Sequence, residues 1–406
     1  MTNWGGKVYE KILFFFLLLC YQVSVFAIPK VESPCIYFYQ LDRGEVLYEQ
    51  DSKEEIAVAS LTKIMTSLVA LDLITDLDDE VVLTSKDFKG LREANASVAG
   101  FFIGEKVTYR DLLYGLLLPS GADAALAPAN HLVGSEAAFV DKMNEKAKSL
   151  NLEHTHFINT TGLDSDGHYS SVEDIAIILK EALKNPKFEK VFTSKKYITS
   201  NSRHTFKSTL SKTAATYKLD VSYILGSKTG YTYDAGLCLA SIAKHNEETY
   251  LLVTANADYK AHKPYHIMDT DKLYKFFFEN YEYKTLLEKD QKLKTIIDAN
   301  ELEHDFFSDK VIIRYLPKNS IIDYQYNGLE FIDYDMDGGS KIGEYQVLVD
   351  NKVVDTQEFF LDEKIIKPKN FPWLWVGIGV GIFLLLIIIL ITIKGRKKRM
   401  RKKEEI

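Results

Sequence analysis

Apolar residues recur at helical spacing in several segments of the first two thirds of the chain. Beyond Ser60 they return every three or four positions as far as Ile74, which predicts a helix that begins at Ser60 and buries one face. Ser171 is a good N-cap for another helix, because acidic residues follow it in the first turn. The same spacing predicts further helices over 112–118, 124–132, 140–150 and 172–183.

Strands are predicted where β-branched and aromatic residues cluster or alternate with polar ones. In the first part of the chain these segments are 35–39, 45–48, 223–226, 227–229, 238–243 and 250–255. Helices bracketed by such strands predict an α/β (α+β) domain over 28–281. Period-two alternation then recurs over 310–315, 321–326, 329–334, 343–350 and 353–361. These short strands predict a small all-β sandwich domain over 282–364, followed by a linker over 365–370.

The N-terminal segment 1–27 has the pattern of a secretory signal peptide. Lys7 and Lys11 precede an apolar run, and small residues before Ala27 suit cleavage after that residue. An uncleaved anchor is the alternative, and it is disfavoured because the apolar run is short for a membrane span. The sequence therefore predicts export of the region that follows.

The C-terminal segment 371–393 is uncharged and long enough to cross a bilayer as a helix. Trp373 and Trp375 open it, as residues of an interfacial aromatic belt do. The tail 394–406 carries eight Lys and Arg residues and two Glu. By the positive-inside rule this tail is cytoplasmic, and the domains before the span lie outside the membrane.

Composition and charge narrow the class of partner. The chain has 406 residues, which favours two folded units, and 46% of them are hydrophobic. Without the +6 of the tail and the +1 of the signal segment, the net charge of −7 becomes −14, which excludes nucleic acid as an expected partner. With the signal removed, only Cys35 and Cys238 remain, and they are expected to be core thiols rather than a disulfide framework.

Candidate chemistry lies in three short motifs. Ser60 and Lys63 are three residues apart, so on a helix they share one face and the amine can take the proton of the hydroxyl. Ser120 stands before a predicted helix, and Lys228 lies in the predicted strand that continues into Thr229-Gly230. A nucleophile, an amine base and a second cation in this order indicate acyl transfer.

These motifs resemble those of the penicillin-binding proteins, and their order resembles the low-molecular-mass serine D-alanyl-D-alanine carboxypeptidases of the peptidase S11 type. The resemblance extends to 161–163 and 167–170, and to the β-rich region, so it covers about residues 30–364. It implies the penicillin-binding-protein/β-lactamase-like transpeptidase fold for 28–281. It also implies an enzyme that needs no cofactor.

The resemblance also assigns roles. Ser60 is the expected nucleophile, Lys63 its base and Ser120 a proton relay. Like-charge repulsion by Lys228 is expected to lower the pKa of Lys63. The substrate carboxylate is expected at Lys228, Thr229 and Gly230, and the oxyanion at the backbone N–H groups of Ser60 and Tyr231.

The expected partners are peptidoglycan stem peptides ending in D-Ala-D-Ala, β-lactams as inhibitors, and the membrane through the C-terminal helix. The protein is expected at the outer face of the cell membrane of a bacterium of the Gram-positive type.

One position departs from the family pattern. Ala122 stands where the family's second motif usually has an asparagine, whose side chain holds the catalytic lysine and a substrate amide. Loss of such a hydrogen bond costs on the order of 1.5–3 kcal/mol, or about ten- to a hundredfold in rate, if nothing compensates. Asp123 is not expected to substitute, because the next helical position points about 100° away.

Two alternative functions, and a separate question of a metal site, stand beside this interpretation. A β-lactamase-like hydrolase would need an acid placed for deacylation, and no convincing segment for one was found. A catalytically weakened penicillin-binding or cell-wall scaffold protein is suggested by Ala122. His154 and His156 could ligate a metal, but they lack further ligands at suitable spacing, so no metal is expected.

Overall fold

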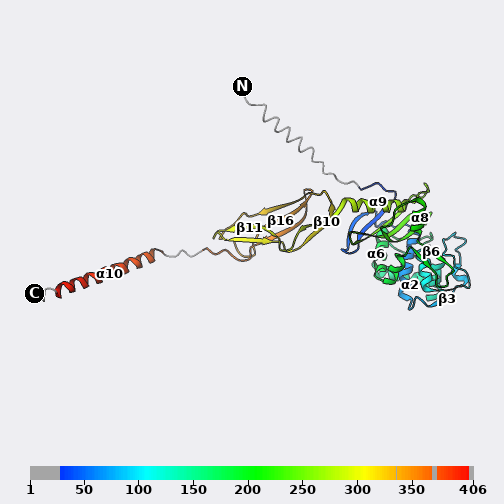
Figure 1. Ribbon diagram of the computed structural model, residues 1–406, viewed down its shortest axis with the longest axis horizontal. Coiled ribbons are helices and arrows are strands. Elements are labelled where there is room, and N and C mark those ends of the chain that lie inside the picture. Colours follow the sequence, from blue (N-terminus) through cyan, green and yellow to red (C-terminus); the bar gives the residue numbers. More distant parts are fainter. Residues whose placement is uncertain (1–27, 335, 368–372, 402–406) are drawn as a thin grey trace, which may run out of the picture. The chain divides into compact units, whose positions relative to one another are not determined.

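The computed structural model describes residues 28–334, 336–367 and 373–401 (Figure 1). Its described residues form two compact units, one made of 28–282 with 315–318, the other of 283–314 with the described residues from 319 onward. The predicted signal peptide lies outside the described residues, as does the end of the predicted linker. The two units are considered separately below.

A five-stranded sheet is the centre of the first unit. Its order is β2-β1-β9-β8-β7, and every neighbouring pair is antiparallel. The strands are β1 (Cys35–Gln40), β2 (Glu45–Gln50), β7 (Ile224–Thr232), β8 (Gly236–His245) and β9 (Glu248–Ala257). Strand β7, which carries Lys228-Thr229-Gly230, is therefore an edge strand with one side free of a sheet partner.

Strand β7 is one continuous strand, so the expectation of separate strands over 223–226 and 227–229 was wrong. A register shift between Ile224 and Gly226 lies just before the predicted boundary, and the pairing with β8 continues without a break from Gly226 to Thr232. A Cβ at Gly226 would lie 2.6 Å from the ring of Phe192 and 2.8 Å from its carbonyl oxygen. Glycine is thus required there by close packing, not by a break in the strand.

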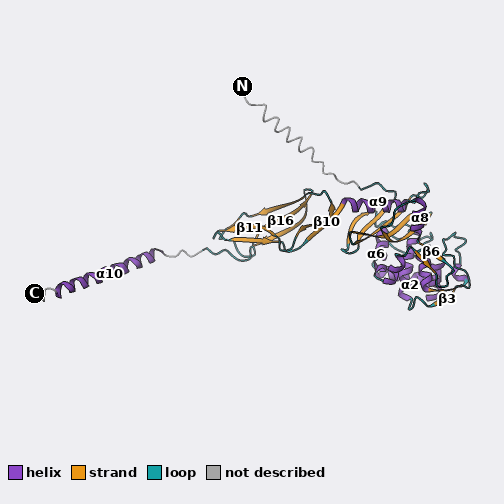
Figure 2. Ribbon diagram, in the orientation of Figure 1, coloured by secondary structure: helices purple, strands orange, loops and turns teal. Residues whose placement is uncertain are grey.

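Helices cover both faces of this sheet (Figure 2). Helix α6 (Val172–Leu183) packs on β1, β8 and β9, and α9 (Tyr265–Asn280) packs on β8 and β9. Alternate residues of β1 enter two different cores, because side chains alternate across a strand. Tyr37 and Tyr39 belong to the larger core, while Phe38 packs with Tyr274 on the α9 side.

Helix α2 (Thr62–Leu73) lies in the first unit, among helices that pack around it (Figure 1). Its residues from Thr62 to Leu71 are all buried, as expected for a helix enclosed by other elements. The surrounding helices include α3 (Tyr109–Leu117), α4 (Asp123–Val133), α5 (Glu136–Ser149) and α6. The predicted helices are thus present, with ends shifted by a few residues.

Several elements of the first unit were not predicted. They include three helices, α7 (Pro186–Phe192), α8 (Thr209–Tyr217) and α9. They also include two pairs of short antiparallel strands, β3 (Glu80–Val82) with β4 (Lys106–Thr108) and β5 (Lys196–Ile198) with β6 (Thr205–Lys207). Short 3₁₀ turns occur at η1 (Ala59–Leu61) and η2 (Ser85–Phe88). Of these, η1 and α8 contribute to the candidate site.

The second unit is rich in strands, as predicted. One three-stranded sheet has the order β12-β11-β15, another β14-β16-β17, and β10 pairs with β13. Ile296, Ile332, Ile342 and Phe359 form its core. The strands are β10 (Tyr281–Leu287), β11 (Lys292–Asp298), β12 (Glu303–Phe307), β13 (Ile312–Pro317), β14 (Ile322–Gly328), β15 (Phe331–Ile332), β16 (Lys341–Val349) and β17 (Lys352–Phe360).

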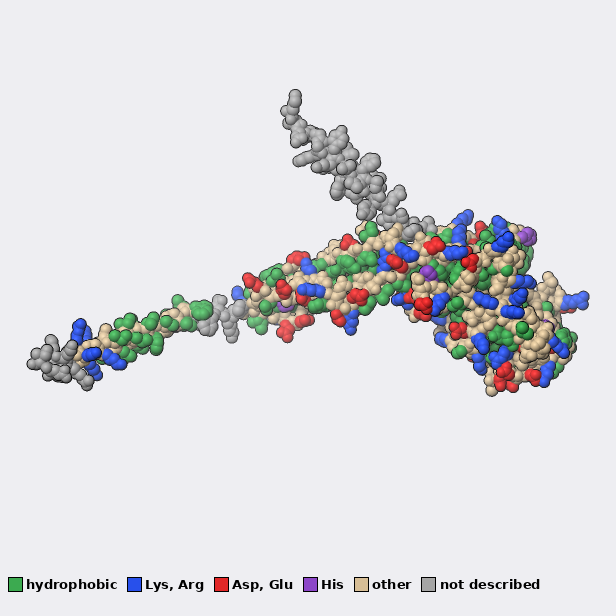
Figure 3. All heavy atoms as spheres, viewed as in Figure 1, with side chains coloured by type: hydrophobic (Ala, Val, Ile, Leu, Met, Phe, Trp, Pro, Cys, Tyr) green, Lys and Arg blue, Asp and Glu red, His purple; other side chains and the backbone are tan. Residues whose placement is uncertain are grey.

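Helix α10 (Trp373–Arg401) contains a stretch, Trp373–Arg399, that is long and apolar enough to cross a membrane by length and composition. Figure 3 shows hydrophobic side chains along this helix, with Lys and Arg side chains near its C-terminal end. This pattern agrees with the predicted span and the start of the basic tail.

Both cysteines of the described region are free and buried, as expected. Burial raises the pKa of the Cys35 thiol to about 11 and that of Cys238 to about 12. Both thiols are core side chains of the first unit.

Candidate active site

Ser60 lies in the 3₁₀ turn η1, immediately before α2. The expectation that Ser60 itself starts the α-helix was wrong by two residues: Ala59 has a left-handed backbone with φ +48°, Ser60 lies in a 3₁₀ turn, and α2 begins at Thr62. Two glycines allow the chain to pass close to this turn. A Cβ at Gly162 would lie 1.9 Å from the Ala59 carbonyl oxygen, and one at Gly230 would lie 3.1 Å from the Ala59 Cβ.

Lys63 is 2% exposed, and its amine faces Ser60. Its Nζ donates to Ser60 Oγ at 2.8 Å and to the carbonyl oxygen of Thr161 at 2.5 Å. Burial lowers the pKa of Lys63 to about 7, with Asp123 acting in the opposite direction. The expected repulsion by Lys228 is therefore not the main cause of this lowered pKa. An amine of this pKa can accept a proton near neutral pH.

Lys228 is fully buried, and its amine donates hydrogen bonds to neighbouring residues of the protein. Its Nζ donates to Ser120 Oγ at 2.8 Å and to the Thr229 carbonyl oxygen at 2.7 Å. Burial lowers the pKa of Lys228, and the charge of Lys63 lowers it further. Ser120 has φ +66°, a conformation that turns the chain between α3 and α4. The structure thus joins the second and third motifs through one hydrogen bond.

The Thr229 hydroxyl has a partner that the sequence did not suggest. Its Oγ1 lies 2.6 Å from Thr209 Oγ1, at the first residue of α8. Both residues are half-buried. The region around 202–210 resembles the family only loosely, and α8 was not predicted, so no sequence signal pointed to Thr209. The two hydroxyls are hydrogen-bonded to each other at this distance, which leaves one of their two protons free to be donated to a ligand.

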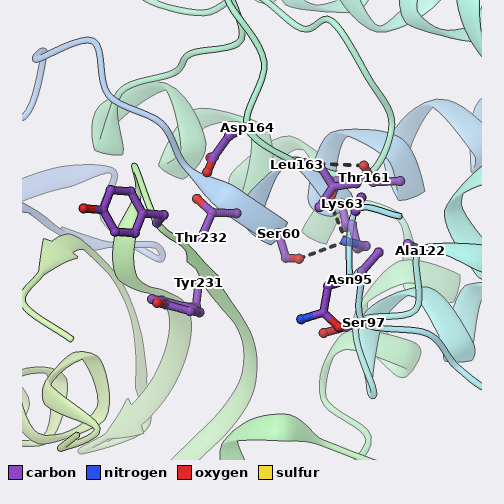
Figure 4. A pocket seen from close by; sticks show the side chains of 14 residues that line it. Ser60, Lys63, Asn95, Ser97, Ala122, Thr161, Leu163, Asp164, Tyr231 and Thr232 are labelled. Carbon is purple, nitrogen blue, oxygen red and sulfur yellow. Dashed lines mark hydrogen bonds between the residues drawn. The ribbon is translucent and has the colours of Figure 1, made fainter. Parts of the chain in front are cut away.

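A cavity of about 560 Å³ opens beside Ser60. Figure 4 shows the Ser60 hydroxyl directed at the Lys63 amine, with Tyr231 on one side and Asn95 on the other. Of the predicted site residues, Ser60, Lys63 and Tyr231 line the cavity, while Ser120 and Lys228, which are hydrogen-bonded to each other, are not among its lining residues. Its other walls are residues 94–97, Ala122, 161–164, Thr232 and Tyr233.

Asp123 is directed away from Lys63, as its helical position predicted. Its carboxylate accepts hydrogen bonds from the backbone N–H groups of Ala99, Gly100 and Phe101. It therefore fixes the loop before the second motif instead of replacing an amide at position 122.

The turn that supplies the Thr161 carbonyl is held by Asn159, whose Oδ1 accepts from Thr161 and Gly162 N–H. His168 Nε2 bonds Thr62 Oγ1 at 2.9 Å, and burial lowers the pKa of His168 to about 4, so this imidazole is neutral. These contacts support a structural role for His168. Among the described residues no cluster of three or more His, Cys, Asp or Glu could hold a metal.

The chain is similar to known proteins of one family. The family model of D-alanyl-D-alanine carboxypeptidases, peptidase S11, matches residues 24–259. The chain is 35% identical over 272 residues to D-alanyl-D-alanine carboxypeptidase DacF of Bacillus subtilis, covering 65% of this chain and 67% of that one. It is 30% identical over 232 residues to DacA of Escherichia coli, covering 54% and 55%.

Solved structures show the same fold. The crystal structure of a Streptomyces DD-transpeptidase has a TM-score of 0.55 at 29% identity, covering 62% of this chain and 98% of that one. The D-alanyl-D-alanine carboxypeptidase DacD of Francisella tularensis has a TM-score of 0.65 at 20% identity, covering 84% and 95%. These likenesses confirm the predicted fold class. The chain therefore belongs to the peptidase S11 family of D-alanyl-D-alanine carboxypeptidases, the low-molecular-mass penicillin-binding proteins, and is a serine-type hydrolase.

Proposed function

We propose that this chain is a membrane-anchored D-alanyl-D-alanine carboxypeptidase that removes the terminal D-alanine from peptidoglycan stem peptides through an acyl-enzyme on Ser60. The observation that carries the proposal is the 2.8 Å contact between Ser60 Oγ and the buried Lys63 amine, whose pKa is lowered to about 7. A serine hydroxyl needs a neighbouring base to become a good nucleophile, and a neutral amine is such a base.

In the first step, Ser60 Oγ attacks the carbonyl carbon between the two D-alanines while Lys63 takes its proton. The backbone N–H groups of Ser60 and Tyr231 bind the oxyanion. The close approach of β7 supports this placement, because a Cβ at Gly230 would lie 3.2 Å from the Ser60 nitrogen. The carbon–nitrogen bond then breaks, and the leaving amine receives a proton.

Ser120 is the proposed relay for that proton. Its Oγ accepts from Lys228, which leaves its own hydroxyl proton free to be donated toward the leaving amine. Ser120 in turn takes the proton that Lys63 removed from Ser60, so Lys63 is neutral again when D-alanine leaves. Water then attacks the ester carbonyl while Lys63 accepts a proton from it and returns that proton to Ser60 Oγ as the ester bond breaks, which releases the shortened stem peptide.

The substrate carboxylate is proposed to bind at the β7 edge, at the hydroxyls of Thr229 and Thr209. At 2.6 Å the two hydroxyls are hydrogen-bonded to each other, so one of them is free to donate to the carboxylate and the other can join it only when that bond opens. Lys228 supports this site through its bonds to Ser120 and to the Thr229 carbonyl oxygen, which hold the strand that carries the Thr229 hydroxyl. Gly230 contributes by letting the strand pass next to Ala59. β-Lactams, which present a strained amide beside a carboxylate, are expected to acylate Ser60 as well.

The location proposed for the enzyme is the outer face of a Gram-positive type cell membrane. Helix α10 would be the anchor, with the basic tail in the cytoplasm and both folded units outside.

The deciding experiment is release of D-alanine from a synthetic peptide ending in D-Ala-D-Ala, together with labelling by a fluorescent penicillin. Wild-type protein is expected to release D-alanine and to form a stable label that is lost in Ser60→Ala. Rapid turnover of the label would instead favour a β-lactamase-like hydrolase. Folded wild-type protein without label or release would favour the scaffold alternative.

A further inference from the structure

The loop over residues 89–97 places a carboxamide in the catalytic cavity. Among the described residues that line this cavity, Asn95 is the one that carries a carboxamide. Figure 4 shows its side chain extending into the space beside Ser60, next to Ser97. Asn95 is exposed to the cavity, and its side chain makes no hydrogen bond to any described residue. It is therefore available to a ligand.

The loop over residues 89–97 packs against Ala122. Its side chain is 2% exposed and packs in an apolar cluster with Leu91 and Leu126, against which Ala96 also packs. Its backbone N–H donates to the carbonyl oxygen of Ser97 at 2.8 Å. A small apolar residue at position 122 thus holds both ends of the segment that carries Asn95.

The backbone of Asn95 suits an asparagine. Its φ of +47° is left-handed, a region in which asparagine is enriched among residues other than glycine. Its N–H bonds the Arg92 carbonyl oxygen at 3.1 Å, and the Ala96 N–H bonds the Leu91 carbonyl oxygen at 2.9 Å. A closed turn of this kind fixes where the side chain leaves the loop.

Lys63 does not need this carboxamide, because its amine is already bonded to Ser60 and to the Thr161 carbonyl oxygen. The carboxylate of the substrate is assigned to Thr209 and Thr229 on the β7 side. The wall opposite β7, where Asn95 lies beside Ala122, is then left to contact the amide on the acyl side of the scissile bond.

We propose that Asn95 binds the acyl-side amide of the substrate, and so supplies from the 89–97 loop the carboxamide that position 122 lacks. This inference rests on the proposed function. It explains why Ala122 is compatible with activity. Alanine at position 122 lacks the carboxamide of the usual asparagine, but the 89–97 loop packs on this alanine and places the Asn95 carboxamide in the cavity.

The test uses two β-lactams that differ at one group. Benzylpenicillin carries an acylamido side chain beside its ring, whereas 6-aminopenicillanic acid has a bare amine there. Asn95→Gly removes the carboxamide and tolerates the positive φ without strain. Its rate of Ser60 acylation by benzylpenicillin is expected to fall about tenfold, and its rate with 6-aminopenicillanic acid to stay within about twofold of wild type.

Asn151→Gly is the matched control, since Asn151 is also exposed, has φ +55°, and lies outside the residues that line the cavity. It is expected to leave both rates unchanged. Equal losses with both β-lactams in Asn95→Gly, or no loss with either, would overturn the inference. Wild-type protein that neither acylates nor releases D-alanine would instead overturn the proposed function, so the two failures are distinguishable.

Discussion

The turn that carries Ser60 is shaped by its neighbours more than by its own sequence. Ala59 holds a left-handed backbone that alanine adopts only at a cost of about 1–2 kcal/mol. Gly162 and Gly230 both pack against this turn: a Cβ at Gly162 would clash with Ala59, and one at Gly230 would fit only if its neighbours shifted. The position of the nucleophile therefore depends on residues about 100 and 170 positions away in the chain.

Gly162→Ala is expected to displace this turn. Its φ is +77°, and the new Cβ would lie 1.9 Å from the Ala59 carbonyl oxygen, so the clash adds to the backbone strain. We expect a loss of at least about 3 kcal/mol in the free energy of unfolding, together with loss of penicillin labelling. Gly167→Ala is the control, because φ is +79° but the nearest atom is 3.9 Å away. A loss above about 2 kcal/mol in the control would contradict this account.

The lowered pKa of Lys63 predicts the pH dependence of acylation. The amine acts as a base only when neutral, so the rate is expected to rise with pH and to reach half of its plateau near pH 7. The measurement is the second-order rate of penicillin acylation between pH 5 and about 9, at constant ionic strength. A rate that still rises tenfold per pH unit at about pH 9, as a base with the usual lysine pKa of about 10.4 would give, would show that burial does not hold the amine neutral.

At this scale the sequence was informative about pairs that are close along the chain. Ser60 and Lys63 meet because they are three residues apart, and no distant contact is needed to predict it. The Thr161 carbonyl and the Asn95 carboxamide could not be predicted, since each reaches the cavity through a tertiary contact. The cause of the Lys63 pKa was missed for the same reason, because burial is a property of the fold.

At the scale of elements, the candidate site lies where an edge strand meets a helix. Strand β7 presents Lys228 to Ser120 and Thr229 to α8, because successive side chains point to opposite faces of the sheet. Helix α8 is rich in Ser, Thr and Ala, and Leu210 is its one aliphatic residue larger than alanine, so its sequence did not reveal it. Its role in the site follows from packing on β7.

Thr209→Val is expected to weaken binding of the substrate carboxylate. Valine keeps the shape of threonine but removes the hydroxyl that lies 2.6 Å from Thr229 Oγ1. Loss of a hydrogen bond to a charged group costs about 1.5–3 kcal/mol, so kcat/KM for D-alanine release should fall about ten- to a hundredfold. Thr213→Val, one turn later on α8, is the control and should change kcat/KM less than about twofold. Equal effects of the two substitutions would contradict a role for the Thr209 hydroxyl.

At the scale of the whole molecule, two folded units precede an apolar helix. The strand-rich unit was predicted from its later strands, whereas β10, β11 and β12 were missed. Strand β11 alternates lysines with Leu293 and Thr295, and β12 places His304 between acidic residues, so their apolar signal is weak. Their pairing in register, rather than their composition, makes them strands.

Helix α10 is expected to account for membrane attachment by itself. A chain that ends at Lys367 should be recovered in the soluble fraction and keep the D-alanine-releasing activity of the full chain. Full-length protein should stay with membranes after alkaline carbonate washing and be released by detergent. A variant with 373–393 replaced by an uncharged Leu/Ala helix is the control, and it should remain attached. Membrane retention of the shortened chain would show that another surface contributes.

The two free thiols of the described residues have a consequence for how this protein folds and is handled. Cys35 and Cys238 are buried and their pKa values are raised, so little thiolate is available to react with oxidants while the first unit stays folded. That unit should therefore mature without oxidative folding catalysts and be indifferent to the redox state of its compartment. The same thiols become reactive when the first unit unfolds. The rate of their alkylation by a maleimide therefore reports how fast this unit opens.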